Sequence, residues 1–94
     1  MQIKITIRYE AQTRRAVGLD EEIIEMTAPC RVSDCIQHLA NVHPESLRPI
    51  IINSSGHIQP SLLIFLGDDQ VIRDDAQELS AGDTITIMTP ISGG

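Results

Sequence analysis

The chain opens with a strict alternation of apolar and polar side chains, which is the pattern of a half-buried strand over Gln2–Tyr9. The apolar positions are Ile3, Ile5, Ile7 and Tyr9, and the polar positions between them are Lys4, Thr6 and Arg8. A second strand is predicted over Glu21–Thr27, close enough to pair with the first as a hairpin. The polar residues 10–20, which include Gly18, are predicted to be the connection.

Helical spacing replaces the alternation after Pro29. Ser33 is predicted to be the N-cap, with Asp34 in the first turn, where the helix dipole favours an acid. Pro44 is expected to end the helix near Val42. One apolar stripe would then face a sheet, and its members are Val32, Cys35, Ile36, Leu39 and Ala40. A further short helical turn is predicted within Glu45–Ile50.

The second half of the chain predicts further strands. Asn53–Gly56 is a turn, Leu62–Leu66 is an apolar run of strand length, and Thr84–Met88 is a last strand rich in β-branched residues. Thr89–Gly94 is expected to be a flexible tail. This order predicts an α+β fold, with residues 1–94 as a single domain in which a mixed sheet packs on one main helix.

Composition and charge exclude several classes of function. Tyr9 and Phe65 are the only aromatic residues, which argues against a site built on stacked bases or sugars. The net charge is −6, so the basic footprint of a nucleic-acid-binding protein is missing. Without a membrane-spanning run or a signal-peptide pattern, no membrane association and a cytoplasmic location are expected. Six acidic residues cluster before the predicted last strand: Asp68, Asp69, Asp74, Asp75, Glu78 and Asp83. They either steer a basic protein partner toward this surface or form a solvated acidic surface.

Several motifs together resemble the MoaD/ThiS sulfur carriers, a family with the β-grasp fold of ubiquitin. They are the strand Ile3-Ile5-Ile7, the helix start Val32-Ser33-Asp34, His43-Pro44, Ile64–Asp68, Leu79–Asp83, and the end Thr89-Pro90-Ile91-Ser92-Gly93-Gly94. The resemblance covers nearly the whole chain, and its most specific part is the terminal Gly93-Gly94 after a strand and a proline.

The resemblance implies a chemical role for the carboxylate of Gly94. In this family a ubiquitin-activating-like adenylyltransferase uses ATP to join that carboxylate to AMP, and a sulfur donor (a sulfurtransferase or a persulfide) converts it to a thiocarboxylate. A sulfur-accepting synthase then makes molybdopterin, cysteine, thiamine or a related product. The chain itself would be no enzyme, with no catalytic residue, metal or stably bound cofactor of its own. The resemblance also implies that the chain could be the small subunit of a synthase such as molybdopterin synthase.

The residues of the tail suit this chemistry. An α-carboxyl group has a pKa of about 3.5, so Gly94 is ionised and nucleophilic at neutral pH. Gly93 and Gly94 lack side chains and can enter a channel that a Cβ would block. Pro90 restricts the chain before Ile91 and Ser92, which limits the entropy lost on capture. The alternative is that Gly93 and Gly94 are a frayed terminus without a function.

Departures from the family pattern leave the pathway open. The first strand continues as Arg8-Tyr9-Glu10-Ala11, Gly67 stands where the family often has asparagine, and Ile52–Ser61 is longer than in compact members. Two other functions also stay open. The chain could be a ubiquitin-like protein modifier that is conjugated through Gly94 to a target lysine, or a non-covalent β-grasp interaction module.

Two further sites can be considered from the sequence. Cys30, Cys35, His38 and His43 have a spacing unlike that of usual zinc ligands, so core or surface roles are favoured and Cys30 is expected to be exposed. The strand Leu62–Leu66 is apolar on both faces, and one of them is either a docking surface or covered by residues 45–60. The predicted partner-binding residues are Phe65, Thr84, Thr86 and Met88.

Overall fold

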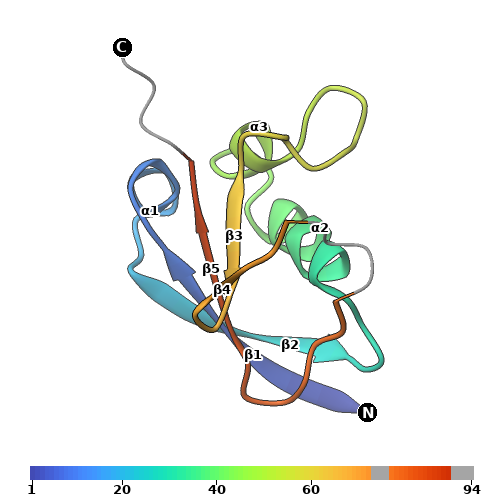
Figure 1. The fold of residues 1–94 in the computed structure, drawn as a ribbon. Coiled ribbons are helices and arrows are strands. Elements are labelled where there is room, and N and C mark those ends of the chain that lie inside the picture. The colour runs from blue at the N-terminus through green and yellow to red at the C-terminus, as the bar shows by residue number, and fades with distance from the viewer. Residues whose placement is uncertain (73–76, 90–94) are drawn as a thin grey trace.

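The computed structural model describes residues 1–72 and 77–89. In these residues, five strands form one mixed sheet in the order β2-β1-β5-β3-β4. Helices α2 and α3 lie on one of its faces, and α1 lies beside the end of β5 (Figure 1). The elements in chain order are β1 (Gln2–Tyr9), α1 (Gln12–Val17), β2 (Glu21–Thr27), α2 (Val32–Val42), α3 (Arg48–Ile51), β3 (Leu63–Leu66), β4 (Asp69–Gln70) and β5 (Thr84–Met88).

The register of the strands places isoleucines side by side on the inner face of the sheet. β1 pairs with β2 as an antiparallel hairpin, with Ile5 opposite Ile24. The central pair is β1 and β5, which run parallel and place Ile7 opposite Ile85. β5 is also antiparallel to β3. The predicted hairpin and the predicted mixed sheet are therefore both confirmed.

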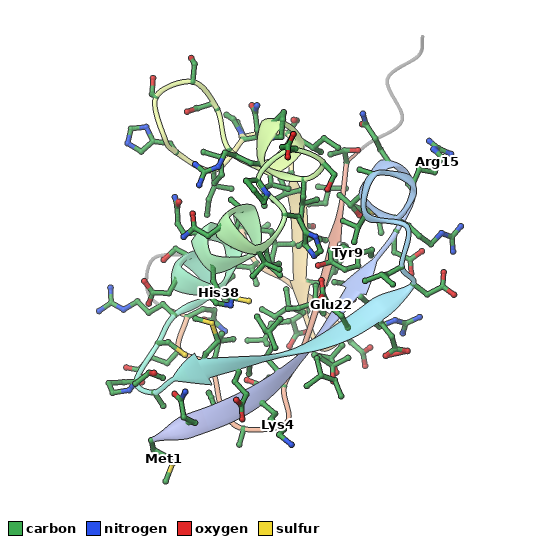
Figure 2. All side chains as sticks on the ribbon, turned by 180° about the vertical axis from the view of Figure 1, so that it is seen from behind. Met1, Lys4, Tyr9, Arg15, Glu22 and His38 are labelled. Atoms are coloured by element: carbon green, nitrogen blue, oxygen red, sulfur yellow. The ribbon has the colours of Figure 1, made fainter. Side chains whose placement is uncertain are left out.

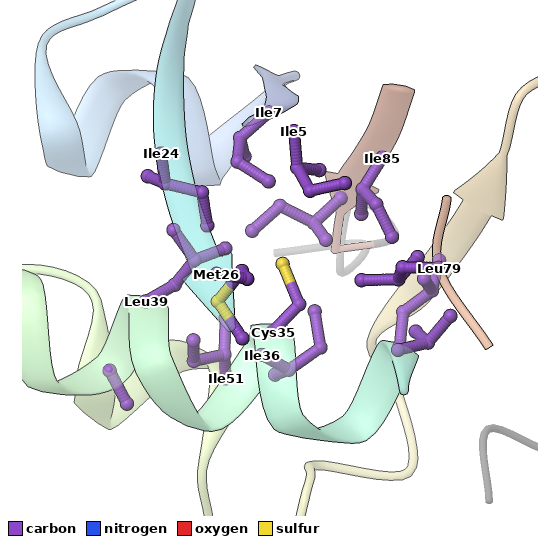
Figure 3. Packing of buried hydrophobic residues seen from close by; sticks show 14 of the residues in the cluster. Ile5, Ile7, Ile24, Met26, Cys35, Ile36, Leu39, Ile51, Leu79 and Ile85 are labelled. Atoms are coloured by element: carbon purple, nitrogen blue, oxygen red, sulfur yellow. The ribbon is translucent and has the colours of Figure 1, made fainter. Parts of the chain in front are cut away.

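Helix α2 covers this inner face with the predicted apolar stripe. Val32, Cys35, Ile36, Leu39 and Ala40 are all fully buried. They pack against β-strand residues such as Ile5, Ile24 and Ile85 (Figure 3). Burial of a leucine or isoleucine side chain stabilises the folded state by about 1.5–3 kcal/mol, so the stripe is the main reason why the helix stays on the sheet.

The predicted N-cap of α2 is wrong by two residues. The helix begins at Val32 with Arg31, not Ser33, as the N-cap, in an extended backbone conformation. Asp34 lies at the third helical position, and its Oδ2 accepts a hydrogen bond of 2.8 Å from the backbone N–H of Arg31. The carboxylate of Asp34 thus reaches back to the helix start, which is why a serine cap is not needed there.

Residues 10–20 were predicted to be a connection alone, and this was incomplete because they contain α1. This six-residue helix ends at Gly18, whose left-handed backbone (φ 82°) allows its N–H to reach the carbonyl of Arg14. The predicted turn near Glu45–Ile50 is present as α3, shifted to Arg48–Ile51. Pro49 is in its first turn, where a missing N–H is tolerated.

Both cysteines are buried free thiols, so the expectation that Cys30 is exposed is wrong. Burial raises the pKa of the Cys35 thiol from 9.0 to about 12, with smaller contributions from Cys30 and Asp34. Burial also raises the pKa of Cys30, followed in size by the charges of Asp34 and Glu78. None of the helices in the described ranges is long and apolar enough to cross a membrane.

Because the thiolate is the reactive form, we expect Cys35 to resist alkylation in the folded protein. At pH 8 a rise of the pKa from 9.0 to about 12 lowers the thiolate fraction about a thousandfold. Iodoacetamide labelling followed by peptide mass analysis should therefore modify Cys35 rapidly only in denaturant. Labelling of the folded protein at the rate of the denatured chain would contradict the burial of this thiol.

Candidate functional site

The predicted partner-binding residues lie together on the outer face of the sheet, away from α2. Phe65 on β3 is directly opposite Thr86 on β5, and Thr86 is opposite Arg8 on β1. Met88 and Leu63 form the next pair along the same two strands. Except for the exposed Arg8, these side chains are half-buried. They form a partly apolar surface on β5 and the two strands next to it.

Residues 45–60 do not cover this surface, so that alternative is wrong. Leu47 and Ile51 from this segment are fully buried in the core that α2 shares, and Ile52 is nearly so. Ile58 packs against the same core. The segment is held on the inner side of the sheet because its apolar residues extend the core, and Leu63 and Phe65 stay partly exposed on the outer side.

The end of β5 is attached to α1 by side-chain hydrogen bonds. The hydroxyl of Thr13 lies 2.9 Å from the carbonyl oxygen of Ile87, to which it donates. The hydroxyl of Thr89 donates to Oε1 of Gln12 at 2.9 Å. Gln12 and Thr13 could not be predicted as functional residues from the sequence, because two polar residues in a polar stretch carry no periodic signal.

The terminal residues proposed to react lie outside the described residues. These are Pro90, Ile91, Ser92, Gly93 and Gly94, and Thr89 is the last described residue before them. Of the acidic residues noted in the sequence, Asp74 and Asp75 also lie outside. Asp83 caps the neighbouring turn through a hydrogen bond of 2.8 Å from the backbone N–H of Ser80.

At the end of β1, two side chains bond to the same carboxylate oxygen of a third. The Tyr9 hydroxyl donates to Glu22 Oε2 at 2.5 Å, and His43 Nε2 lies 2.7 Å from the same oxygen. The rings of Tyr9 and His43 meet edge to face at 6.3 Å. Figure 2 shows Tyr9 and Glu22 close together beside the β1–β2 hairpin. This cluster ties both strands to the C-terminal end of α2.

Loss of Glu22 should destabilise the fold more than loss of the Tyr9 hydroxyl. Tyr9 is 1% exposed, so Glu22→Ala leaves a buried donor unpaired at a cost of about 2 kcal/mol, whereas Tyr9→Phe should cost about 1 kcal/mol. Denaturant unfolding of both variants and of the double variant measures the coupling. Additive effects would contradict a direct hydrogen bond.

The same pair predicts a loss of stability in alkali. Burial raises the pKa of Tyr9 above its usual 10.0, and the hydrogen bond and the charge of Glu22 raise it further. The folded state therefore holds the phenolic proton more tightly than the unfolded chain does. This contribution is fully present below pH 10.0 and is lost as the pH rises above it, and Tyr9→Phe should lack this dependence.

The four residues considered for zinc are not arranged as a ligand set. Cys30 and Cys35 are buried, and His43 is hydrogen-bonded to Glu22 on β2. Within residues 1–72 and 77–89, no group of three or more histidines, cysteines, aspartates or glutamates is placed to hold a metal ion.

The arrangement of helix and sheet is that of a ubiquitin-like β-grasp protein. The structure is similar to that of SAMP1 from Haloferax volcanii, with a TM-score of 0.87 and 18% sequence identity over 97% of this chain and 99% of that chain. It is also similar to small archaeal modifier protein 1 from Methanosarcina acetivorans, with a TM-score of 0.81 and 22% identity over 100% and 99% of the two chains. The predicted β-grasp fold is therefore confirmed.

Sequence comparison identifies the family within this fold. Residues 7–94 match the ThiS family. Over 94 residues, the whole of both chains, the protein is 26% identical to the molybdopterin synthase sulfur carrier subunit of Chlamydomonas reinhardtii. The chain belongs to the ThiS family, as the resemblance of its motifs predicted.

Proposed function

We propose that this protein is a sulfur carrier whose Gly94 carboxylate is adenylated and then converted to a thiocarboxylate. The observation that carries the proposal is that the match to the ThiS family continues to Gly94 itself. The relative from Chlamydomonas reinhardtii is named a sulfur carrier subunit of molybdopterin synthase, which supports the same role for this chain.

The proposed chemistry needs an activated carboxyl group, because a carboxylate is a poor electrophile. An oxygen of Gly94 attacks the α-phosphorus of ATP, the bond to the bridging oxygen breaks, and pyrophosphate leaves. Hydrosulfide then attacks the acyl carbon and displaces AMP, which leaves the thiocarboxylate. With a protein persulfide as donor, an acyl disulfide forms first and a second thiol cleaves it. The carrier contributes only the reacting group, and the activating enzyme supplies the catalysis.

Three partners follow from this sequence of steps. They are a ubiquitin-activating-like adenylyltransferase, a sulfurtransferase or other persulfide donor, and a synthase that accepts the sulfur. The outer face of the sheet includes β5, the strand that precedes the tail. We therefore propose that partners which bind the tail also contact this surface. Phe65, Thr86 and Met88 would supply its apolar contacts, and Thr84 lies on the same face of β5.

Intact-mass spectrometry tests the proposal directly. The protein is incubated with ATP, an adenylyltransferase from the same organism and a sulfide or persulfide donor. Replacement of one terminal oxygen by sulfur is the expected result, and it should depend on ATP. Covalent adducts with lysines of other proteins would instead support the protein modifier. Tight binding without any covalent change would support a non-covalent interaction module and overturn the carrier proposal.

A further inference from the structure

We infer that α1 is a positioning element for the reaction at Gly94: Gln12 and Thr13 hold the end of β5 and so set the point from which the tail leaves the fold. This pair of residues is called the α1 anchor below. The inference rests on the proposed function, and it assigns a role to a segment that has no other part in the proposed chemistry.

The side chain of Thr13 is hydrogen-bonded to the backbone near the end of β5. Its side chain is fully buried, which is unusual for a residue in a short surface helix. The hydroxyl lies 2.9 Å from the Ile87 carbonyl oxygen and 2.8 Å from that of Glu10, and it accepts a hydrogen bond of 3.1 Å from the backbone N–H of Glu10. The same N–H lies 3.2 Å from the Ile87 carbonyl. One hydroxyl therefore joins the start of α1 to the strand.

Gln12 holds the residue that follows β5. The register of β5 with β1 ends at the pair Tyr9–Ile87, and its register with β3 ends at Leu63–Met88. Thr89 lies beyond both, yet it is only 9% exposed, and its hydroxyl donates to Gln12 Oε1. The side chain of Gln12 thus extends the ordered part of the chain one residue past the sheet.

The position of Thr89 limits where the reacting group can go. Gly94 is the fifth residue after Thr89, and a fully extended chain spans at most about 3.5 Å per residue, so the carboxylate reaches no further than about 18 Å from Thr89. If the α1 anchor is lost and the chain frees itself back to Ile87, the tail has two more residues to order when a partner captures it. Ordering of residues opposes binding, so capture should weaken.

The chemical step itself should be unaffected, because Gly93, Gly94 and their carboxylate are unchanged once the tail is bound. Loss of the α1 anchor should therefore raise the KM of the adenylyltransferase for this carrier by roughly thirtyfold or more, with kcat within about twofold. A general loss of folded carrier would also raise the apparent KM, because the carrier is the varied substrate, but it would speed amide exchange at Ile24 and Met26 as well as at the end of β5.

Two variants and two controls test the inference. Thr13→Val removes the buried hydroxyl at nearly constant volume, and Gln12→Ala removes the partner of Thr89 from an exposed position, where folding is not at risk. Thr13→Ser keeps the hydroxyl and should restore the wild-type KM. Thr27→Val is the matched control, because Thr27 donates a hydrogen bond of 2.6 Å to Gln2 Oε1 at the other end of the sheet.

Two measurements are made on each variant. The first is amide hydrogen exchange at Met88 and Thr89 compared with Ile24 and Met26; Thr13→Val and Gln12→Ala should speed exchange only at the end of β5. The second is the rate of ATP-dependent pyrophosphate release as a function of carrier concentration. KM and exchange values that match those of Thr27→Val would overturn the inference. A wild-type protein that is not adenylated would refute the proposed function and with it the positioning role, whereas hydrogen exchange would still show whether the α1 anchor holds β5.

Discussion

Removal of Gly94 should abolish thiocarboxylate formation while leaving the fold intact. The truncated chain still ends in a glycine carboxylate, but that group is one residue, about 3.5 Å, short of the position that the adenylyltransferase requires. A displacement of even 1 Å can slow an enzymatic step about a hundredfold, so we expect a loss of at least about that size. Pyrophosphate release and intact mass after incubation with ATP and a sulfur donor measure it.

The control for this truncation keeps the length of the tail. Ser92→Ala changes a side chain but retains both terminal glycines, and it should be loaded within a few-fold of the wild-type rate. Thermal unfolding should give the same midpoint for both variants and the wild type, because both changes leave every described residue of the buried core unaltered. Loading of the truncated protein at a rate close to that of Ser92→Ala would contradict a reaction at Gly94.

Leu39→Ala should cause a large loss of stability. Leu39 is fully buried in the core between α2 and the sheet (Figure 3). Its replacement removes apolar contacts and leaves a cavity, which together cost about 2–5 kcal/mol. Domains of this size are stable by only about 5–15 kcal/mol, so the midpoint of urea unfolding should fall sharply.

Val42→Ala is the matched control for this substitution. Val42 is the last residue of the same helix but is 43% exposed, so its truncation should change the free energy of unfolding by less than about 0.5 kcal/mol. A loss for Leu39→Ala no larger than that for Val42→Ala would contradict core packing as the force that holds α2 in place, because alanine favours the helix at both positions.

The parts of the fold that follow from local pattern were predicted well. Alternation in Gln2–Tyr9 and helical spacing in Val32–Ala40 both identify the buried face, because each element must turn its apolar side chains away from water. The same logic failed for α1. Its six residues have only one fully buried side chain, Thr13, and that side chain is polar, so neither hydropathy nor periodicity marks the helix.

The candidate site likewise has a part that could be predicted from the sequence and a part that could not. The grouping of Phe65, Thr86 and Met88 on one face could be anticipated, since residues two apart in a strand share a face and neighbouring strands place their outward residues side by side. The cluster of Tyr9, Glu22 and His43 could not be predicted from the sequence. These three residues come from three separate elements, and only the packing of α2 on the β1–β2 hairpin places the imidazole beside the carboxylate.

By itself, the sequence determined which segments become strands and helix, which of their faces are buried, and which family the motifs resemble. These properties depend on side-chain order along short stretches of chain. Only the tertiary structure decided that a short polar segment, Gln12 and Thr13, holds the last residues before the tail. The physical reason is distance: 74 positions separate Thr13 from Ile87 and 77 separate Gln12 from Thr89, and hydrogen bonds across such separations exist only once the sheet has closed.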